Sequence, residues 1–130
     1  MNKAADFSTP MTIIKATLGA TPETSDPFEI VNAWIEGNYM HVSVRYSGGC
    51  GEHTFQCIGS LQISKSLPPR RSLALIHTNH EDFCKKNISD TLIVDLKALT
   101  YQQTEGSEIL LDLMNWKSPL LYVYTNKEVK

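Results

Sequence analysis

Two segments of the sequence bring together side chains that can bind a metal ion or do thiol chemistry. The glycine-rich segment at residues 47–53 carries Cys50 and His53 in a Cys-x2-His spacing, and a later segment carries His77 and Cys84 in a His-x6-Cys spacing. Two thiolates and two imidazoles are a ligand set typical of tetrahedral Zn²⁺, and thiolates also suit Cu(I). The four residues are therefore a candidate metal site, with zinc as the expected ion and copper as the alternative.

The two halves of this candidate site differ in how well their spacing fits a metal. The Cys-x2-His spacing is familiar among metal ligands, whereas the longer His77–Cys84 spacing requires a loop that folds back on itself. His80 is an alternative ligand to His77. Acidic side chains in the same segments can accept the second N–H of a ligating imidazole. They are Glu52, Glu81 and Asp82.

The same cysteines allow two structural interpretations without a metal. A Cys50–Cys84 disulfide would close a loop of about 34 residues and stabilise the fold by about 3–4 kcal/mol in the chain-entropy model. Alternatively all three thiols are free, and Cys57, which lies in phase with Phe55, is a small core residue. An oxidising compartment favours the bridge, and a reducing one favours the metal site or the free thiols.

A thiol-dependent enzyme is a further interpretation of the same residues. Cys50 with His53 or His77 supplies a nucleophile and a base, and Glu52 or Asp82 can orient the imidazole. The glycine-rich loop can present backbone N–H groups to an oxyanion. Residue types alone do not establish the geometry that catalysis needs, so the sequence favours a non-catalytic role.

The elements that must position these residues are β-strands, because the hydrophobic pattern has a period of two. Between residues 39 and 46, apolar side chains alternate with polar ones, which predicts a strand buried on one face. The sequence at 36–38 predicts a tight turn from a preceding strand. The expected strands are 12–18, 28–35, 38–46, 54–63, 72–77, 91–96, 108–114 and 120–125, with helical turns at 81–88 and 97–103.

Seven or eight short strands without a βαβ alternation predict an all-β fold. We expect a single antiparallel β-sandwich, immunoglobulin-like in architecture, over residues 12–130, preceded by a flexible tail at 1–11. The chain of 130 residues has the length of one domain. In this fold the two cysteine-bearing loops are expected to meet at one end.

Composition excludes several classes of partner. Twelve basic and 14 acidic residues give a net charge of −2, which implies no basic face for nucleic acid. No apolar run approaches the ~20 residues of a membrane-spanning helix.

The N-terminus lacks the apolar core of a signal peptide, so either the protein is cytoplasmic or an export signal has been removed. A protein partner is expected at a sheet edge or at the hairpin tip that carries Trp116.

The motif around the candidate site resembles that of small uncharacterised exported domains of bacterial cell envelopes, often lipoproteins. The similarity covers residues 42–99 and rests on the pattern GGCGxHxF, followed by LIH, a cysteine and an LxxDL segment. The resemblance implies a β-sandwich in the cell envelope, no established activity, and a motif that contains Cys50, His53, His77 and Cys84. This chain departs from the pattern because it lacks a signal peptide and a lipobox cysteine. The expected function is a non-catalytic binding or accessory module.

Overall fold

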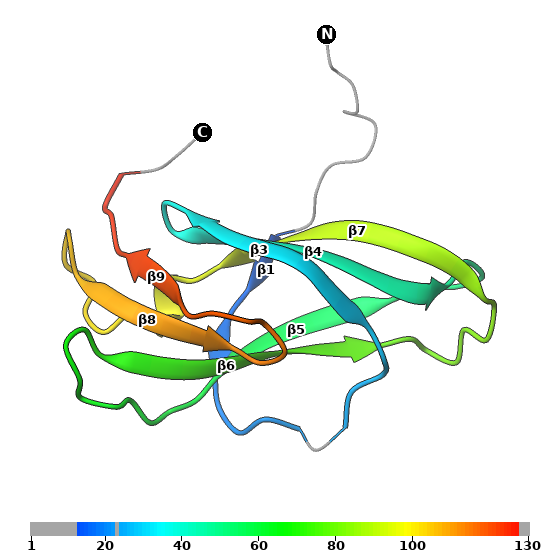
Figure 1. Ribbon diagram of the computed structural model, residues 1–130, viewed down its shortest axis with the longest axis horizontal. Coiled ribbons are helices and arrows are strands. Elements are labelled where there is room, and N and C mark those ends of the chain that lie inside the picture. The colour runs from blue at the N-terminus through cyan, green and yellow to red at the C-terminus, as the bar shows by residue number, and fades with distance from the viewer. Residues whose placement is uncertain (1–12, 23, 128–130) are drawn as a thin grey trace, which may run out of the picture.

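The computed structural model describes residues 13–22 and 24–127, which form two β-sheets packed face to face (Figure 1). The expected tail at 1–11 lies outside the described residues. Along the chain the elements are β1 (Ile13–Lys15), β2 (Thr17–Leu18), β3 (Glu29–Glu36), β4 (Tyr39–Gly48), β5 (Thr54–Gly59), β6 (Arg70–Thr78), β7 (Lys86–Asp95), the 3₁₀ helix η2 (Lys97–Leu99), β8 (Glu108–Leu113) and β9 (Leu120–Val123).

The predicted all-β sandwich is confirmed, but its sheets are mixed rather than purely antiparallel. One sheet has the order β1-β7-β4-β3 and the other has the order β2-β5-β6-β8-β9. Of the seven strand pairings among the described residues, β1–β7, β2–β5 and β6–β8 are parallel. The chain leaves β6, forms β7 in the opposite sheet and returns to the sheet of β6 as β8. Because the chain crosses twice between the sheets, β8 runs parallel to β6.

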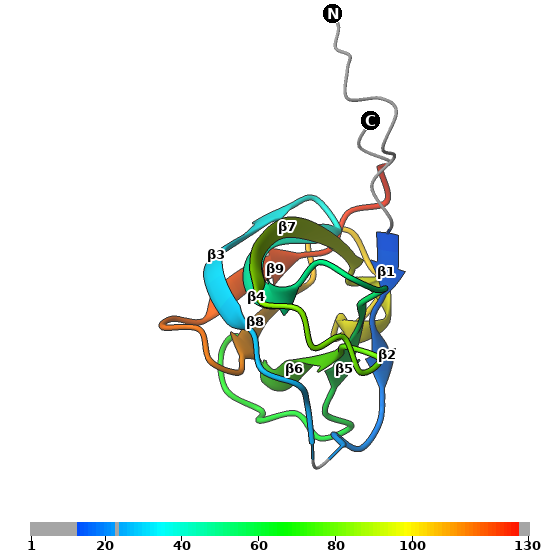
Figure 2. The same cartoon turned by 90° about the vertical axis from the view of Figure 1, so that its right-hand side faces the viewer.

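The expected N-terminal strand is divided between the two sheets. Residues 13–15 pair with β7, and residues 17–18 pair with β5 in the other sheet. Ala16 lies between the two halves, is 3% exposed, and donates its N–H to the carbonyl oxygen of Asp95 at 3.0 Å. β1 and β2 therefore run across one open side of the sandwich, as Figure 2 shows.

The core lies between the sheets and follows the predicted alternation. Met40, Val42 and Val44 on β4 are at most 1% exposed, whereas the side chains between them are half-buried. They pack with inward residues of the second sheet, including Leu73 and Leu111. Burial of one face of each sheet is the main force that holds the two layers together.

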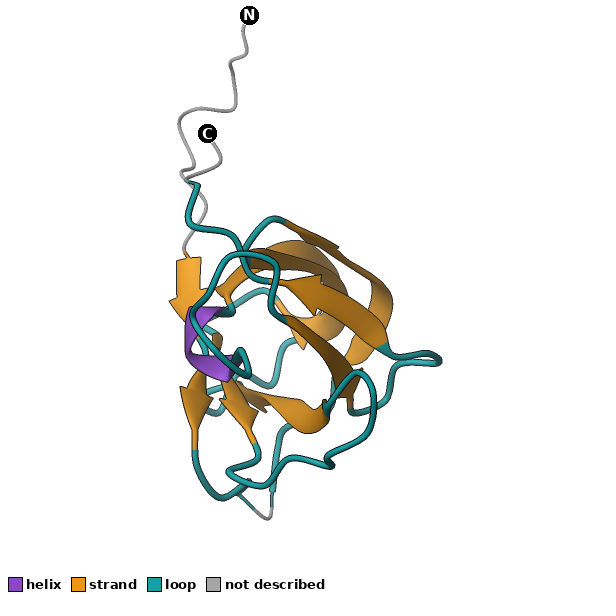
Figure 3. Cartoon of the chain, turned by 90° about the vertical axis from the view of Figure 1, so that its left-hand side faces the viewer, coloured by secondary structure: helices purple, strands orange, loops and turns teal. Residues whose placement is uncertain are grey.

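The expected helical turn at residues 81–88 is wrong. β7 already begins at Lys86, and residues 86–90 pair with residues 44–48 of β4. Pairing with a long neighbouring strand outweighs the weak local preference of this short segment for a helical turn. In the expected turn at 97–103, Lys97–Leu99 are helical, and they form the one helix in the described part of the chain (Figure 3). No described helix is long and apolar enough to span a membrane.

Candidate functional site

The strand pairing brings the two cysteine-bearing loops to the same end of the sandwich. The loop at 49–53 leaves β4 and enters β5, and the loop at 79–85 leaves β6 and enters β7. Gly48 at the end of β4 lies opposite Lys86, and Thr54 at the start of β5 lies opposite Thr78. Both loops therefore cross between the β4–β7 pair in one sheet and the β5–β6 pair in the other, at the same end of the sandwich. The predicted meeting of the loops is confirmed.

Cys50 and Cys84 form a disulfide that joins the two loops. Their Cα atoms are 5.8 Å apart and 34 positions separate them in the chain. Cys57 is free and buried in β5, as expected for the spare cysteine. Of the alternatives that the sequence allowed, the structure has the bridge.

Asp82 lies at the centre of the site with its carboxylate fully buried. One oxygen accepts the backbone N–H groups of Cys50 and Gly51, both at 3.1 Å, and the other accepts the N–H of Cys84 at 3.1 Å. His53 Nε2 lies 2.8 Å from the first oxygen. The hydrogen bond from His53, together with those from the backbone, lowers the pKa of Asp82 to about 2 despite its burial. Asp82 is therefore an anion that fixes both loops.

His53 and His77 are in direct contact. His53 Nδ1 lies 2.8 Å from His77 Nε2, and His77 Nδ1 lies 3.0 Å from the carbonyl oxygen of Pro27. The side chain of His53 is 4% exposed and His77 is 2% exposed. Burial lowers the pKa of His77, and its hydrogen bond to Pro27 opposes this shift. His80, the alternative ligand, is instead exposed and lies 3.1 Å from the hydroxyl of Thr54.

Aromatic rings enclose the two histidines. Phe55 stacks on His77 with ring centroids 4.6 Å apart, and Tyr46 lies 4.5 Å from the ring of His53. Phe28 packs edge-on against both Phe55 and His77. Tyr46 and Phe55 were identifiable from their inward phase, whereas the contact with Phe28 depends on how the loop before β3 crosses the end of the sandwich.

The four expected metal ligands are close together, but their ligand atoms are engaged. Both sulfur atoms form the disulfide, and the ring nitrogens face Asp82, each other and Pro27. In the bridged protein neither Cys50 nor Cys84 has a thiolate to offer a metal, and Cys50 has no thiol to act as a nucleophile. Ligand atoms of Cys50, Asp82 and Cys84 lie within 4.8 Å of one another. A zinc site stays a prediction for the reduced chain only.

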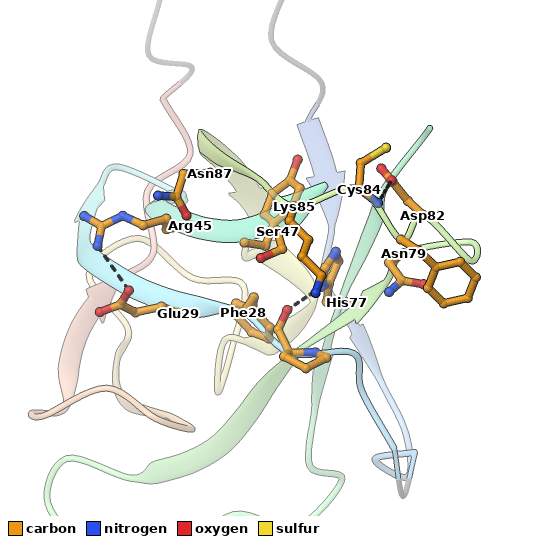
Figure 4. Close-up of a pocket in the computed structure, with 13 residues that line it drawn as sticks. Phe28, Glu29, Arg45, Ser47, His77, Asn79, Asp82, Cys84, Lys85 and Asn87 are labelled. Atoms are coloured by element: carbon orange, nitrogen blue, oxygen red, sulfur yellow. Dashed lines mark hydrogen bonds and ion pairs between the residues drawn. The ribbon is translucent and has the colours of Figure 1, made fainter. Parts of the chain in front are cut away.

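A cleft of about 490 Å³ opens beside His77 (Figure 4). It lies between the start of β3, the end of β4 and the loop that carries Asp82, and its charged rim includes Arg45 and Lys85. Arg45 is paired with Glu29 at 3.2 Å. Phe83 also lines the cleft and is 80% exposed.

The sequence matches no known protein-family model and none of the curated proteins. Solved structures with a similar fold include three bacterial proteins. A NigD-like immunity protein from Bacteroides caccae has 17% identity and a TM-score of 0.66 over 81% of this chain and 53% of its own. A protein of unknown function, DUF1344, from Bacteroides vulgatus has 12% identity and a TM-score of 0.55 over 92% and 59%. A protein described as toxin-related from Parabacteroides distasonis has 15% identity and a TM-score of 0.50 over 88% and 62%.

This chain thus spans between 53% and 62% of the length of these similar proteins. At identities of 12–17%, the likeness concerns the fold. This likeness supports the resemblance to small uncharacterised bacterial domains. It supports neither the lipoprotein type nor the motif.

Proposed function

We propose that this chain is a non-catalytic protein-binding module of the bacterial cell envelope that contacts its partner through the disulfide-linked end of the sandwich. The observation that carries the proposal is the position of Phe83. A phenylalanine with 80% of its surface exposed lies between two anchored residues, Asp82 and Cys84, at the rim of a cleft.

The anchoring of Phe83 has an energetic consequence for binding. Association normally costs free energy because loops and side chains lose conformational freedom at the interface. Here the disulfide and the hydrogen bonds of Asp82 already restrict the loop. Exposed aromatic side chains on ordered surfaces often supply much of the binding energy of an interface. Arg45 and Lys85 beside the cleft add polar contacts that can orient a partner.

The comparisons and the disulfide are compatible with this role. One protein of similar fold is named an immunity protein and another is described as toxin-related, and neither description requires catalysis by this fold. A disulfide between surface loops is typical of an oxidising compartment, which supports export to the envelope. The motif resemblance to exported envelope domains points the same way.

The proposal is tested with two matched substitutions of exposed apolar residues. Phe83→Ser alters the proposed surface, and Leu61→Ser alters a residue that is 70% exposed beyond the opposite end of β5. A protein captured from the producing organism by the parent chain is purified, and its affinity for all three chains is measured by calorimetry. We expect binding at least about tenfold weaker with Phe83→Ser and unchanged with Leu61→Ser. Equal binding by the parent chain and Phe83→Ser would overturn the proposed surface.

A further inference from the structure

Three successive polar contacts connect Asp82 to the carbonyl oxygen of Pro27 through the two buried histidines. The contacts join Asp82 Oδ2 to His53 Nε2, His53 Nδ1 to His77 Nε2, and His77 Nδ1 to Pro27 O, at 2.8, 2.8 and 3.0 Å. Each is a hydrogen bond only if one proton lies between its two atoms. Two neutral imidazoles carry two N–H protons, so the three contacts need one proton more than the histidines hold when both are neutral.

The ends of this series decide where the protons lie. The Pro27 carbonyl can only accept, so His77 Nδ1 must carry a proton. Burial among aromatic rings favours the neutral form of His77, which leaves a lone pair on its Nε2. The proton of the central contact therefore belongs to His53 Nδ1, which donates to His77.

The remaining proton lies either on Asp82 or on His53 Nε2. The carboxylate of Asp82 already accepts the backbone N–H groups of Cys50, Gly51 and Cys84. Hydrogen bonds to a carboxylate favour its ionised form. The proton is therefore on His53, which carries N–H groups on both ring nitrogens.

We infer that His53 is held as an imidazolium cation, buried in a pair with the Asp82 anion, and that its second proton is needed to keep the two loops in contact. The pair is neutral as a whole, which limits the cost of burying the two charges. Without this second proton, two lone pairs would face each other in one of the three contacts. The loop at 79–85 would then loosen, with the disulfide as its remaining covalent link.

The charged and titratable groups around His53 are consistent with a cation at this position. Asp82 is the anion in direct contact, and Tyr46 on β4 packs against the ring of His53. Asp26, before β3, lies close enough to influence His77, and Asp90 on β7 acts on Tyr46. The positive groups of this end lie farther out, at the exposed side chains of Arg45, Lys85 and Lys86.

The inference is independent of the proposed binding function and is tested on the isolated chain by NMR. Uniformly ¹⁵N-labelled protein is examined between pH 5.5 and 9.5 with spectra that correlate ring nitrogens with ring protons. At pH 7 we expect His53 to carry protons on both nitrogens and His77 to carry one on Nδ1. The exposed His80 provides an internal reference. A folded protein in which His53 and His77 are both neutral at pH 7 would overturn the inference.

Two further measurements connect the proton to the loops. In Asp82→Asn, we expect His53 to lose its second proton at pH 7, and a doubly protonated His53 would contradict the pairing. If this variant does not fold, hydrogen exchange of the parent chain tests whether the second proton of His53 holds the loops. After correction for intrinsic rates, the amides of Cys50, Gly51 and Cys84 should lose protection as His53 deprotonates, while amides at the centre of β4 do not. Unchanged protection would show that the second proton does not hold the loops.

Discussion

Tyr122 and Asn38 are hydrogen-bonded in the interior of the sandwich, although 84 positions separate them in the chain. The hydroxyl of Tyr122 donates to Asn38 Oδ1 at 2.8 Å, and Asn38 Nδ2 donates to the carbonyl oxygen of Thr125 at 2.8 Å. The backbone carbonyl of Asn38 accepts the N–H of Leu96 at 2.9 Å. Burial raises the pKa of Tyr122, which is fully enclosed. A single residue in the β3–β4 turn thus holds two segments of the chain, one before β8 at Leu96 and one after it at Tyr122 and Thr125.

Replacement of Asn38 should be one of the most destabilising polar substitutions in this chain. Asn38→Ala leaves the Tyr122 hydroxyl and the backbone groups of Thr125 without their partner. We expect a loss of about 3 kcal/mol in the free energy of unfolding, since buried polar groups without partners cost about 1–3 kcal/mol each. Urea denaturation of the parent chain and of Asn38→Ala measures this loss. Tyr122→Phe, which removes one hydroxyl, is the control and should cost about 1 kcal/mol; equal losses would contradict the role given to Asn38.

Removal of the Cys50–Cys84 bridge should destabilise the fold without abolishing it. The 34-residue separation corresponds to about 3–4 kcal/mol in the chain-entropy model. The core between the sheets does not include the bridge, so the double variant Cys50→Ser/Cys84→Ser should still fold. Denaturation of this variant, compared with the parent chain under non-reducing conditions, gives the difference. A difference below about 1 kcal/mol would indicate that the loops are already ordered without the bridge.

Thiol labelling should find one reactive cysteine in the unfolded, unreduced protein and none in the native protein. Cys57 is 1% exposed, and burial raises the pKa of its thiol to about 12. The thiolate is the reactive form, so labelling at pH 7 requires unfolding. Mass spectrometry after alkylation counts the labels. After reduction, two further labels should appear, from Cys50 and Cys84. Three labels on unfolded protein that was never reduced would show that the bridge is absent.

Acid should weaken the fold through Asp82. The pKa of this carboxyl is about 2 in the folded protein and near its ordinary value of 3.8 in the unfolded chain. Because the folded value is the lower one, the contribution of Asp82 is complete above about pH 4 and is lost as the pH falls toward 2. Urea midpoints between pH 2 and 5 should therefore fall less steeply with acid in Asp82→Asn than in the parent chain. Parallel curves for the two proteins would contradict this assignment.

Local sequence patterns predicted the strands, because the alternation at 39–46 requires one buried face. The two loops meet for a non-local reason: β4 pairs with β7 in one sheet, β5 pairs with β6 in the other, and both loops cross between these pairs at the same end. The choice between a disulfide and a metal was not predictable, because the 5.8 Å separation of Cys50 and Cys84 depends on the register of two different sheets. The parallel β6–β8 pairing was missed for a similar reason, since it requires β7 to join the opposite sheet.

The acceptor at the end of the histidine series also lies beyond local prediction. Asp82 was identifiable as a carboxylate near a histidine, and the structure places it there. The carbonyl oxygen of Pro27 has no side-chain signal, because every residue carries a backbone carbonyl. Its position depends on the loop before β3, where Asp26 N–H donates to the carbonyl of His77 at 2.8 Å.

The absence of a side chain at Gly48 should matter more than at Gly51, although both glycines lie in the same motif. A Cβ atom on Gly48 would lie 2.5 Å from His53 Nε2 and 3.0 Å from Asp82 Oδ2. Neither group can withdraw, because His53 is packed against the ring of Tyr46 and contacts His77 through Nδ1, and Asp82 is held by backbone hydrogen bonds. Gly48→Ala should therefore destabilise the fold by about 2–3 kcal/mol, in the upper part of the range of about 1–3 kcal/mol that is usual for overpacking a buried site.

Gly51→Ala is the matched control, because its Cβ would meet the nearest atom, Asp82 Cβ, at an ordinary 3.7 Å. It should change stability by less than about 1 kcal/mol, since the added methyl group fits and restricts only the unfolded chain. Urea denaturation of both variants at pH 7 gives the comparison, and the imidazole spectrum of Gly48→Ala should show a disturbed His53. Equal losses for the two alanines would mean that loop flexibility, rather than the packing of the His53–Asp82 pair, sets the requirement for glycine.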